Sequence, residues 1–260
     1  MSSKCLKVYW ASGLKGGKPN FGDALSPLLC ELLSGRPAVH TRPNRCDLVA
    51  IGSILHRVSH RWFSRKVHVW GTGLMEQKTP FRSRHHYHAL RGRLTQACLR
   101  HEANPVLGDP GLLCHLLLDK PPRKQYPLGL APHYADQDNP VIREFLARNP
   151  QAVLVDVLNE PRAVIEQISR CEVILSSSLH GLAASDALEI PNAWIRLSDH
   201  VRGRDFKFHD YYSVFGIDPQ PFPLTALTRL EEVLALAETY SRPSLAKIQA
   251  DLMASFPFKR

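Results

Sequence analysis

The sequence predicts an α/β protein with two Rossmann-like domains that face one another across a central cleft. Short apolar strands that end in glycine and a hydroxyl residue recur along the chain, as in Asp47–Ser53 and Lys66–Gly73. The alternation of strand and helix then restarts after a polar, proline-rich linker at Lys120–Gln125. Strands and helices in this order favour parallel sheets with helices on their faces.

The first half should hold one strand at Leu6–Trp10 and a helix that follows it. Ser26 and Pro27 are typical of a helix start, and Gly35 is typical of a helix end. Further strands are expected at residues 47–53, 66–73, 87–90 and 106–109. Residues 1–121 are therefore assigned to an N-terminal Rossmann-like domain.

The second half repeats the pattern. Strands are expected at 128–133, 152–157, 173–175 and 192–197, and helices at 141–148, 160–169 and 179–188. Residues 122–224 are assigned to a C-terminal Rossmann-like domain. Residues 225–260 should form helices, starting near Leu227 and Leu245, that pack on the two domains.

Composition and charge restrict the function classes. The chain has 44% hydrophobic residues among 260, and no apolar run approaches the roughly 18 residues of a membrane span. Its amino terminus lacks the apolar segment of a secretory signal, and six scattered cysteines form no CxxC pair, so a cytoplasmic protein without a zinc site is expected. The net charge of +9 favours an anionic partner, but no arginine-rich arm indicates nucleic acid.

Two smaller features bear on metal and membrane binding. The adjacent residues of His85–His88 alternate between opposite faces of an extended segment, so they do not indicate a metal site. The aromatic and basic terminus Phe256–Arg260 predicts a weak, salt-sensitive attachment to anionic membrane.

The most informative stretch runs from Glu172 to Ala187. A buried strand ends in Ser176–Ser178, and a helix follows that carries His180 near its start. Ligands of open parallel sheets bind beyond the carboxyl ends of the strands, where a helix amino terminus favours an anion. His180 is therefore placed to meet an anionic substrate, although a capping histidine would fit the same pattern.

Eight segments in series carry a resemblance to a known family. They are Asn20–Asp23, Gly52-Ser53, Val69–Gly73, Arg91–Thr95, Leu107–Leu113, Pro132-His133, Ser176–Gly181 and Lys207–Tyr212. In order and spacing they resemble the polysaccharide pyruvyl transferases, in particular the short bacterial exopolysaccharide ketal-pyruvate transferases. The resemblance implies a fold similar to the two-domain GT-B glycosyltransferases. It also implies a reaction in which phosphoenolpyruvate, without a cofactor or metal, supplies a pyruvate ketal to two hydroxyls of one sugar.

The resemblance also implies partners and a location. The acceptor of such enzymes is typically an oligosaccharide linked to a lipid diphosphate at the cytoplasmic face of the inner membrane. Peripheral attachment there is expected of this chain.

The resemblance implies that residues 1–121 form the acceptor side of the cleft and residues 122–224 the donor side. The family's donor-binding motifs also imply roles for particular residues. Leu179 and His180 match an Arg-Leu-His segment that binds phosphoenolpyruvate, and Arg91 matches the arginine of an Arg-Gly motif. Ser178 stands where many members have arginine, so one positive charge is missing, and Lys207 is the candidate to replace it. His180 is expected to be the acid or base, and neither His180 nor Arg91 is expected to fill the core.

Other residues are assigned to the acceptor side or to turns. Asp23 either activates the acceptor hydroxyl or caps a helix, and Asp109 is expected to order a turn. The remaining acceptor or cleft candidates are Asn20, Gly52, Ser53, Gly71, Thr72 and His133.

Two other functions stay open. One is a GT-B-type glycosyltransferase that uses a nucleotide sugar, with Glu189 as the candidate ribose-binding acid. The other is a non-catalytic binding module of an export complex.

Overall fold

The computed structural model describes residues 5–13, 17–100, 104–120, 122–201, 203 and 205–259. A six-stranded sheet has the order β2 (Ala38–His40), β1 (Leu6–Tyr9), β3 (Leu48–Val49), β4 (His68–Trp70), β6 (His86–Leu90) and β8 (Val106–Leu107). A four-stranded sheet has the order β10 (Val153–Leu154), β9 (Tyr126–Ala131), β11 (Cys171–Ser176) and β12 (Asn192–Trp194). A small sheet pairs β5 (Phe81–Arg82) with β7 (Leu99–Arg100).

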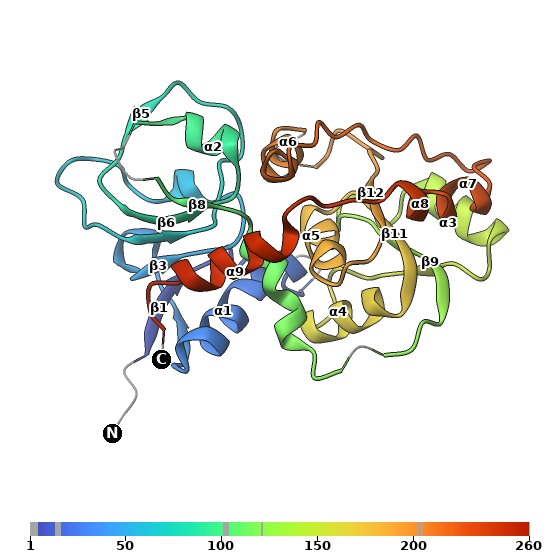
Figure 1. Cartoon of the computed structure of the whole chain (residues 1–260), viewed down its shortest axis with the longest axis horizontal. Helices are drawn as coiled ribbons and strands as arrows, with labels where there is room; N and C mark the ends of the chain where they lie inside the picture. Colours follow the sequence, from blue (N-terminus) through green and yellow to red (C-terminus); the bar gives the residue numbers. More distant parts are fainter. Residues whose placement is uncertain are drawn as a thin grey trace.

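The strands of both larger sheets pair in parallel, which confirms the predicted α/β class (Figure 1). The domain boundaries after residues 121 and 224 stay predictions, and Pro121 itself lies outside the described residues.

The helices complete the pattern. They are α1 (Phe21–Ser34), α2 (Arg93–Ala97), α3 (Pro140–Arg148), α4 (Pro161–Ser169), α5 (Leu179–Ala187), α6 (Phe206–Tyr212), α7 (Leu230–Leu234), α8 (Leu236–Thr239) and α9 (Leu245–Ser255). Short 3-10 turns are η1 (Pro43–Arg45), η2 (Leu55–Arg57), η3 (Pro110–Leu117) and η4 (Ser213–Phe215). The helices predicted between residues 141 and 188 are confirmed to within two residues, whereas the segment from Leu227 is broken into α7 and α8.

Helix α1 corrects the predicted start at Pro27. It begins at Phe21, and Pro27 lies inside it. Phe21, Leu25 and Leu29 are fully buried at helical spacing, so the apolar stripe extends the helix past the hydrogen bond that proline removes. The predicted end is confirmed, since Gly35 has φ of 64° and its N–H donates to the Glu31 carbonyl at 2.9 Å.

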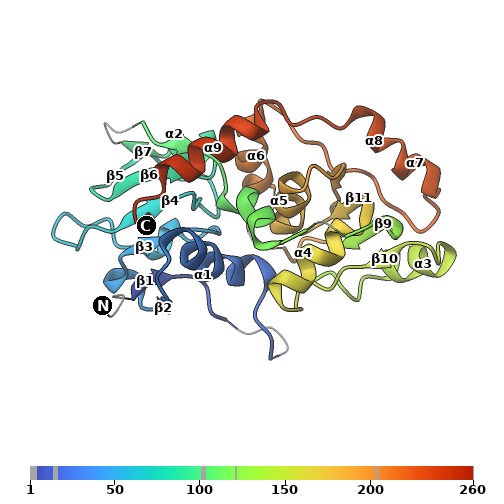
Figure 2. The ribbon, with the colours of Figure 1, turned by 60° about the horizontal axis from the view of Figure 1, so that its bottom comes forward.

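A layer of helices joins the two sheets. Leu25 of α1, Leu113 of η3, Val164 of α4 and Leu182 of α5 belong to one hydrophobic cluster. Both views of the ribbon place these elements between the sheets (Figures 1 and 2). The carboxyl ends of strands from the two sheets are therefore held near one another by a shared core.

The C-terminal segment returns to the first sheet. Helix α9 lies against β6 and β8, and the Trp70 indole N–H donates to the Leu252 carbonyl at 3.0 Å (Figure 1). Phe256 is 3% exposed with its ring 4.8 Å from that of Trp70, and Phe258 packs edge-on against His68 at 4.9 Å. These contacts pack both terminal aromatics against the first sheet, and the predicted attachment of this terminus to anionic membrane stays a prediction. Arg260 is outside the described residues.

Two further findings concern the chain as a whole. All six cysteines are free thiols, and five of them are buried. Within the described residues, none of the helices combines the length and the apolar character needed to cross a bilayer.

Candidate active site

A cavity of about 400 Å³ opens beyond the carboxyl ends of β1, β3, β9 and β11. Strands of both sheets contribute to it, so the site depends on how the shared helical layer holds the sheets. Nine of the predicted site residues line it: Asn20, Asp23, Gly52, Ser53, His133, Ser178, Leu179, His180 and Lys207. Arg91, Gly71 and Thr72 are not among its lining residues.

The turn between β11 and α5 is built from its serines. The Ser176 hydroxyl donates to the Ala131 carbonyl at 2.6 Å and accepts from the Ser178 N–H at 3.0 Å. The Ser177 hydroxyl donates to Asp136 at 2.7 Å and accepts from the His133 N–H at 2.9 Å. Small hydroxyl residues thus join the ends of β9 and β11 and leave Ser178 as the residue before the helix.

Two helices point their amino termini into the cavity. Helix α5 begins at Leu179 and presents His180 in its first turn, and α1 begins at Phe21 with Asn20 before it. Asp23 lies in the first turn of α1, where its charge suits the helix dipole, and it accepts from the Asn20 amide at 3.4 Å. Asp23 is therefore not the capping residue, and it stays a candidate for the acceptor hydroxyl.

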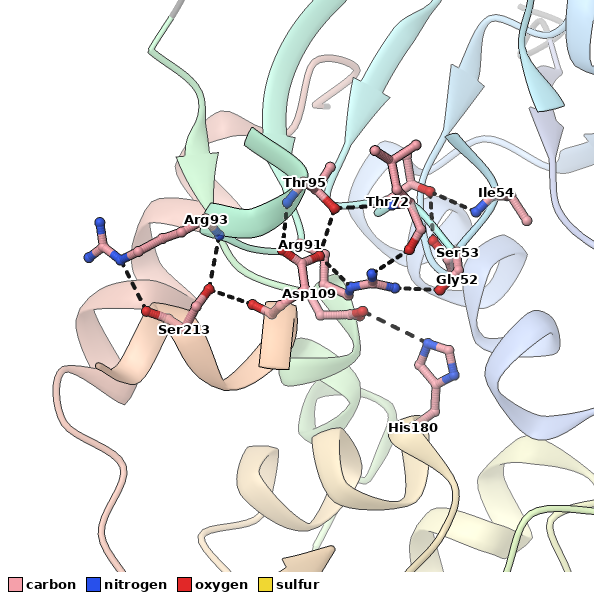
Figure 3. A network of polar contacts seen from close by, with 12 residues as sticks. Gly52, Ser53, Ile54, Thr72, Arg91, Arg93, Thr95, Asp109, His180 and Ser213 are labelled. Carbon is pink, nitrogen blue, oxygen red and sulfur yellow. Dashed lines mark hydrogen bonds and ion pairs between the residues drawn. The ribbon is translucent and has the colours of Figure 1, made fainter. Parts of the chain in front are cut away.

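The His180 ring lies where Gly22 leaves room for it, and it is at ordinary contact distance from Gly111. A Cβ atom at Gly22 would lie 1.9 Å from His180 Nδ1, and one at Gly111 would lie 3.7 Å from the ring carbon Cδ2. His180 Nε2 is buried without a hydrogen bond and lies 3.9 Å from Asp109 Oδ2. Figure 3 shows the ring turned toward Asp109.

The two carboxylate oxygens of Asp109 have different surroundings. Oδ1 accepts from the Gly111 N–H at 2.8 Å and so orders the turn into η3, as the sequence predicts. Oδ2 is buried without a hydrogen-bond partner and faces His180. Burial raises the pKa of Asp109 to about 6, although the Gly111 N–H and the Arg91 charge oppose this shift.

Ionisable side chains of both signs line the cavity, with Arg57 and Lys207 as the bases and Asp23 as the acid. Burial, with smaller effects of Lys207, Arg91 and His133, lowers the pKa of His180 to about 3, so its imidazole is neutral at pH 7. Lys207 on α6 is 8% exposed, and burial and the Arg91 charge lower its pKa to about 7. Asp136 and Asp23 act on Lys207 in the opposite direction.

Arg91 lies behind the cavity wall and is fully buried. Its Nε donates to Asp210 at 2.8 Å, one terminal nitrogen donates to the Leu74 carbonyl at 2.6 Å, and the other donates to the Ser53 hydroxyl (Figure 3). Because Ser53 lines the cavity, Arg91 holds one part of the wall and adds positive potential to the site. The expectation that Arg91 lies outside the core is corrected: its charge is compensated by a buried ion pair with Asp210.

Gly71 and Thr72 shape the loop that carries Gly52. The Thr72 hydroxyl donates to the Gly52 carbonyl at 2.6 Å, and Gly71 adopts φ of 82° with Pro110 packed where a side chain would lie. Both residues therefore support the cavity wall without lining the cavity themselves.

Three residues with clear positions in the site were missed by sequence reasoning. Asp210 accepts from Arg91 and from the N–H and hydroxyl of Thr95 at 2.8 and 2.7 Å, which ties α6 to α2. Asp136 holds the β11 turn, and Gly22 admits the His180 ring. Asp210 and Gly22 lie inside the recognised segments, whereas no sequence signal marked Asp136.

Metal binding has no visible support in the part of the chain that is described, where no group of three or more His, Cys, Asp or Glu could hold an ion. The histidines of the first sheet stack instead, with His68 Nδ1 2.8 Å from His88 Nε2 and His86 packed on His68.

Comparison with known proteins agrees with the motifs that form this cavity. The model of the polysaccharide pyruvyl transferase family matches residues 20–199, which is more than half of the chain. The succinoglycan biosynthesis protein ExoV of Rhizobium meliloti (strain 1021) is 28% identical over 255 residues, which cover 93% of this chain and 75% of that protein. The uncharacterized protein L143 of Acanthamoeba polyphaga mimivirus is 29% identical over 197 residues, covering 72% of this chain and 67% of its own. This chain belongs to the polysaccharide pyruvyl transferase family.

Proposed function

We propose that this chain transfers the pyruvyl group of phosphoenolpyruvate to two hydroxyls of one sugar in a lipid-linked oligosaccharide, forming a pyruvate ketal for a cell-surface polysaccharide. The family match supports pyruvyl transfer, and the name of the Rhizobium relative supports polysaccharide biosynthesis. In this proposal the protein works without a cofactor at the cytoplasmic face of the membrane that holds the acceptor, and GT-B-like closure of two domains would bring the substrates together.

The observation that carries this proposal is the position of Lys207. Its side chain is buried at the cavity with Nζ 5.1 Å from the centre of the Phe208 ring, and the described residues form no hydrogen bond or ion pair with it. A buried cation without an anion partner is costly, so a site of this kind favours an anionic ligand. Phosphoenolpyruvate supplies a carboxylate and a phosphate, and the amino terminus of α5 adds oriented N–H donors.

Lys207 also accounts for the serine at position 178. Lys207 and Ser178 line the same cavity, so in this proposal the lysine supplies the positive charge that many family members place before the Leu-His pair. The guanidinium nitrogens of Arg91 are already hydrogen-bonded to protein groups. In this proposal Arg91 therefore favours donor binding indirectly, through the electrostatic potential of its charge and through its hydrogen bond to Ser53.

Proton transfer is assigned to the pair of His180 and Asp109. Burial, and to a smaller extent the neighbouring cations, keeps the His180 imidazole neutral. A bound dianion reverses the sign of that local field and raises the pKa of His180, while the Asp109 carboxylate at Nε2 stabilises the imidazolium. Nδ1, over Gly22, is then the nitrogen for contact with the donor.

The reaction balances with these groups. The imidazolium gives its proton to the methylene carbon of phosphoenolpyruvate, and the first sugar hydroxyl adds to the central carbon and loses its proton to His180 or Asp23. The C–O bond to phosphate then breaks, and the second hydroxyl attacks the same carbon and passes its proton to the departing phosphate. The products are one ketal and one inorganic phosphate.

A glycosyltransferase with a nucleotide sugar is less well supported. Glu189, its candidate ribose-binding acid, is exposed and follows the carboxyl end of α5, whereas the cavity lies at the amino end of that helix.

The test is incubation with phosphoenolpyruvate and membrane-extracted lipid-linked oligosaccharide. We expect phosphate release that depends on the acceptor, and an acceptor mass increased by one pyruvate less one water. Phosphoenolpyruvate at about 100 times its Kd should also raise the unfolding free energy by about 2.7 kcal/mol. Stabilisation by a nucleotide sugar but not by phosphoenolpyruvate would contradict the proposal.

A further inference from the structure

A turn on the first half of the chain exposes two adjacent aromatic side chains. Trp62 is 76% exposed and Phe63 is 66% exposed, the first and third highest values among the large hydrophobic residues described. Their rings touch edge-on, with centroids 5.9 Å apart. Exposed aromatic side chains packed together are typical of a contact surface.

The turn is held in place by its own polar contacts. The Ser59 and Ser64 hydroxyls lie 2.7 Å apart, and the Ser64 N–H donates to the Arg61 carbonyl at 3.0 Å. An Arg84 guanidinium nitrogen donates to the Trp62 carbonyl at 2.6 Å. The backbone of Ser59–Lys66, which we name the Trp62 turn, therefore presents the two rings outward in a defined geometry.

The charge around the turn has one sign. Arg57, Arg61, Arg65 and Lys66 lie in or beside it, and the sequence contains no aspartate or glutamate between Asp47 and Glu76. Asp47 is already bonded to Arg65 at 2.6 Å. Arg61, Lys66 and Arg84 are exposed beside the aromatic pair and form no salt bridge among the described residues.

The turn is connected to the catalytic cavity. Helix η2 ends at Arg57, which lines the cavity together with His56, and the turn begins two residues later. A membrane or protein surface bound by the turn would therefore lie close to the part of the cavity wall that η2 forms.

We propose that the Trp62 turn docks the protein on an anionic lipid bilayer, with Trp62 and Phe63 inserted at the interface and the surrounding cations paired with headgroups. Tryptophan is favoured at the level of lipid headgroups, and stable peripheral binding requires both an apolar and an electrostatic contribution. The C-terminal aromatics are already packed against Trp70 and His68, whereas the rings of Trp62 and Phe63 are exposed. The inference rests on the proposed function only in placing the acceptor in that bilayer.

The test is vesicle binding with the full-length protein and no substrate. Vesicles of phosphatidylcholine alone are compared with vesicles of about three parts phosphatidylcholine to one part phosphatidylglycerol. Replacing both aromatics (Trp62→Ser with Phe63→Ser) should weaken binding to the anionic vesicles at least about tenfold. Replacing the cations (Arg61→Gln with Lys66→Gln) should weaken it about fivefold per charge and reduce its salt sensitivity.

Two control variants match these changes elsewhere. Leu227→Ser removes a side chain that is 71% exposed, and Arg143→Gln with Arg148→Gln removes two exposed cations of α3. Neither should alter vesicle binding. Unchanged melting temperatures will show that each variant is folded, and Trp62→Phe should retain binding.

The proposal is overturned if the wild type does not prefer anionic vesicles, or if the aromatic variant binds them as well as the wild type. Turnover with a water-soluble acceptor should be the same in the aromatic variant and the wild type. Absence of phosphate release from phosphoenolpyruvate with any acceptor would contradict the proposed function instead, and would leave the vesicle result standing.

Discussion

Asp109 Oδ2 and His180 Nε2 face one another at 3.9 Å inside the protein, and both atoms lack a hydrogen-bond partner. Buried polar atoms without partners are rare in folded proteins and concentrate at functional sites. The gap is short enough to close into a direct hydrogen bond once His180 gains a proton. The relationship couples a residue predicted to order a turn with the residue predicted to transfer protons.

Asp109→Asn should lower kcat about 10²-fold or more if the carboxylate stabilises the imidazolium of His180. Since the pKa of Asp109 is raised to about 6, its charged form is lost as the pH falls through that value. The wild-type rate should therefore decline below pH 6, and the variant should lack this decline. A pH profile of kcat checks both statements, and a variant with the wild-type rate and profile would remove Asp109 from the mechanism.

Asp109→Asn should increase the stability of the protein at neutral pH, although it lowers kcat. The folded state raises the pKa of Asp109 from 3.8 to about 6, so the charged carboxylate costs roughly 3 kcal/mol of unfolding free energy above pH 6 and nothing below pH 3.8. Asparagine keeps the oxygen that accepts from Gly111. Denaturant unfolding should find Asp109→Asn more stable than the wild type at pH 8, with the difference gone near pH 4.

His180→Ala should reduce turnover about 10²–10⁴-fold and change donor affinity much less, because the buried cation of the cavity is Lys207. Adding Asp109→Asn to His180→Ala should cause little further loss, since both residues act through one proton. Single-turnover rates and donor titrations measure the two quantities. A folded His180→Ala protein with near-normal turnover would direct attention to His133 or Asp23 as the acid.

Lys207→Met should raise KM for phosphoenolpyruvate and leave the fold intact, because methionine keeps the buried stem and removes the charge. The pKa of Lys207 is lowered to about 7, so its charge is lost as the pH rises. The wild-type kcat/KM should therefore fall above pH 7, and Lys207→Arg should lack that fall because arginine stays charged.

The matched control for this change is Lys247→Met. Lys247 is an exposed lysine of α9 that is paired only with Asp251 on the surface. Its substitution should leave KM unchanged, and an equal rise in KM for both variants would contradict a donor contact at Lys207.

Arg91→Ala should lower the unfolding free energy by about 3–5 kcal/mol, because it leaves the Asp210 carboxylate buried without its cation. Urea denaturation measures this effect, and Arg91→Ala with Asp210→Asn should recover part of the loss. A variant as stable as the wild type would show that the guanidinium is not needed to hold α6. Donor affinity would then be the quantity to examine in that variant.

Gly22→Ala should impair turnover, because the new methyl group would lie 1.9 Å from His180 Nδ1 and the ring would have to move. Alanine is a better helix former than glycine, so the substitution by itself should stabilise α1 and a loss of turnover would not come from a weakened helix. Gly13→Ala is the control, since Gly13 lines the same cavity and a methyl group there meets nothing within 4 Å. Steady-state kinetics on the two variants distinguish a clash at His180 from a general effect of filling the cavity.

The sequence by itself determined the α/β class, the order of most strands and helices, and the strand ends that carry the site. These features follow from local signals: the apolar periodicity of the strands and helices, and the glycine at position 35 that ends α1. Because parallel strands end at the same edge of a sheet, nine predicted residues could meet in one cavity.

Only the tertiary structure decided which distant groups these residues touch. Arg91 pairs with Asp210, which is 119 positions away, and Phe256 is covered by Trp70. No local pattern encodes such a partner, since a side chain in a core is surrounded by elements that the fold brings together. For the same reason the turn at Asp109 could be predicted from Gly-Asp-Pro, whereas the second oxygen of its carboxylate acquired a role only when η3 and α5 packed against one another.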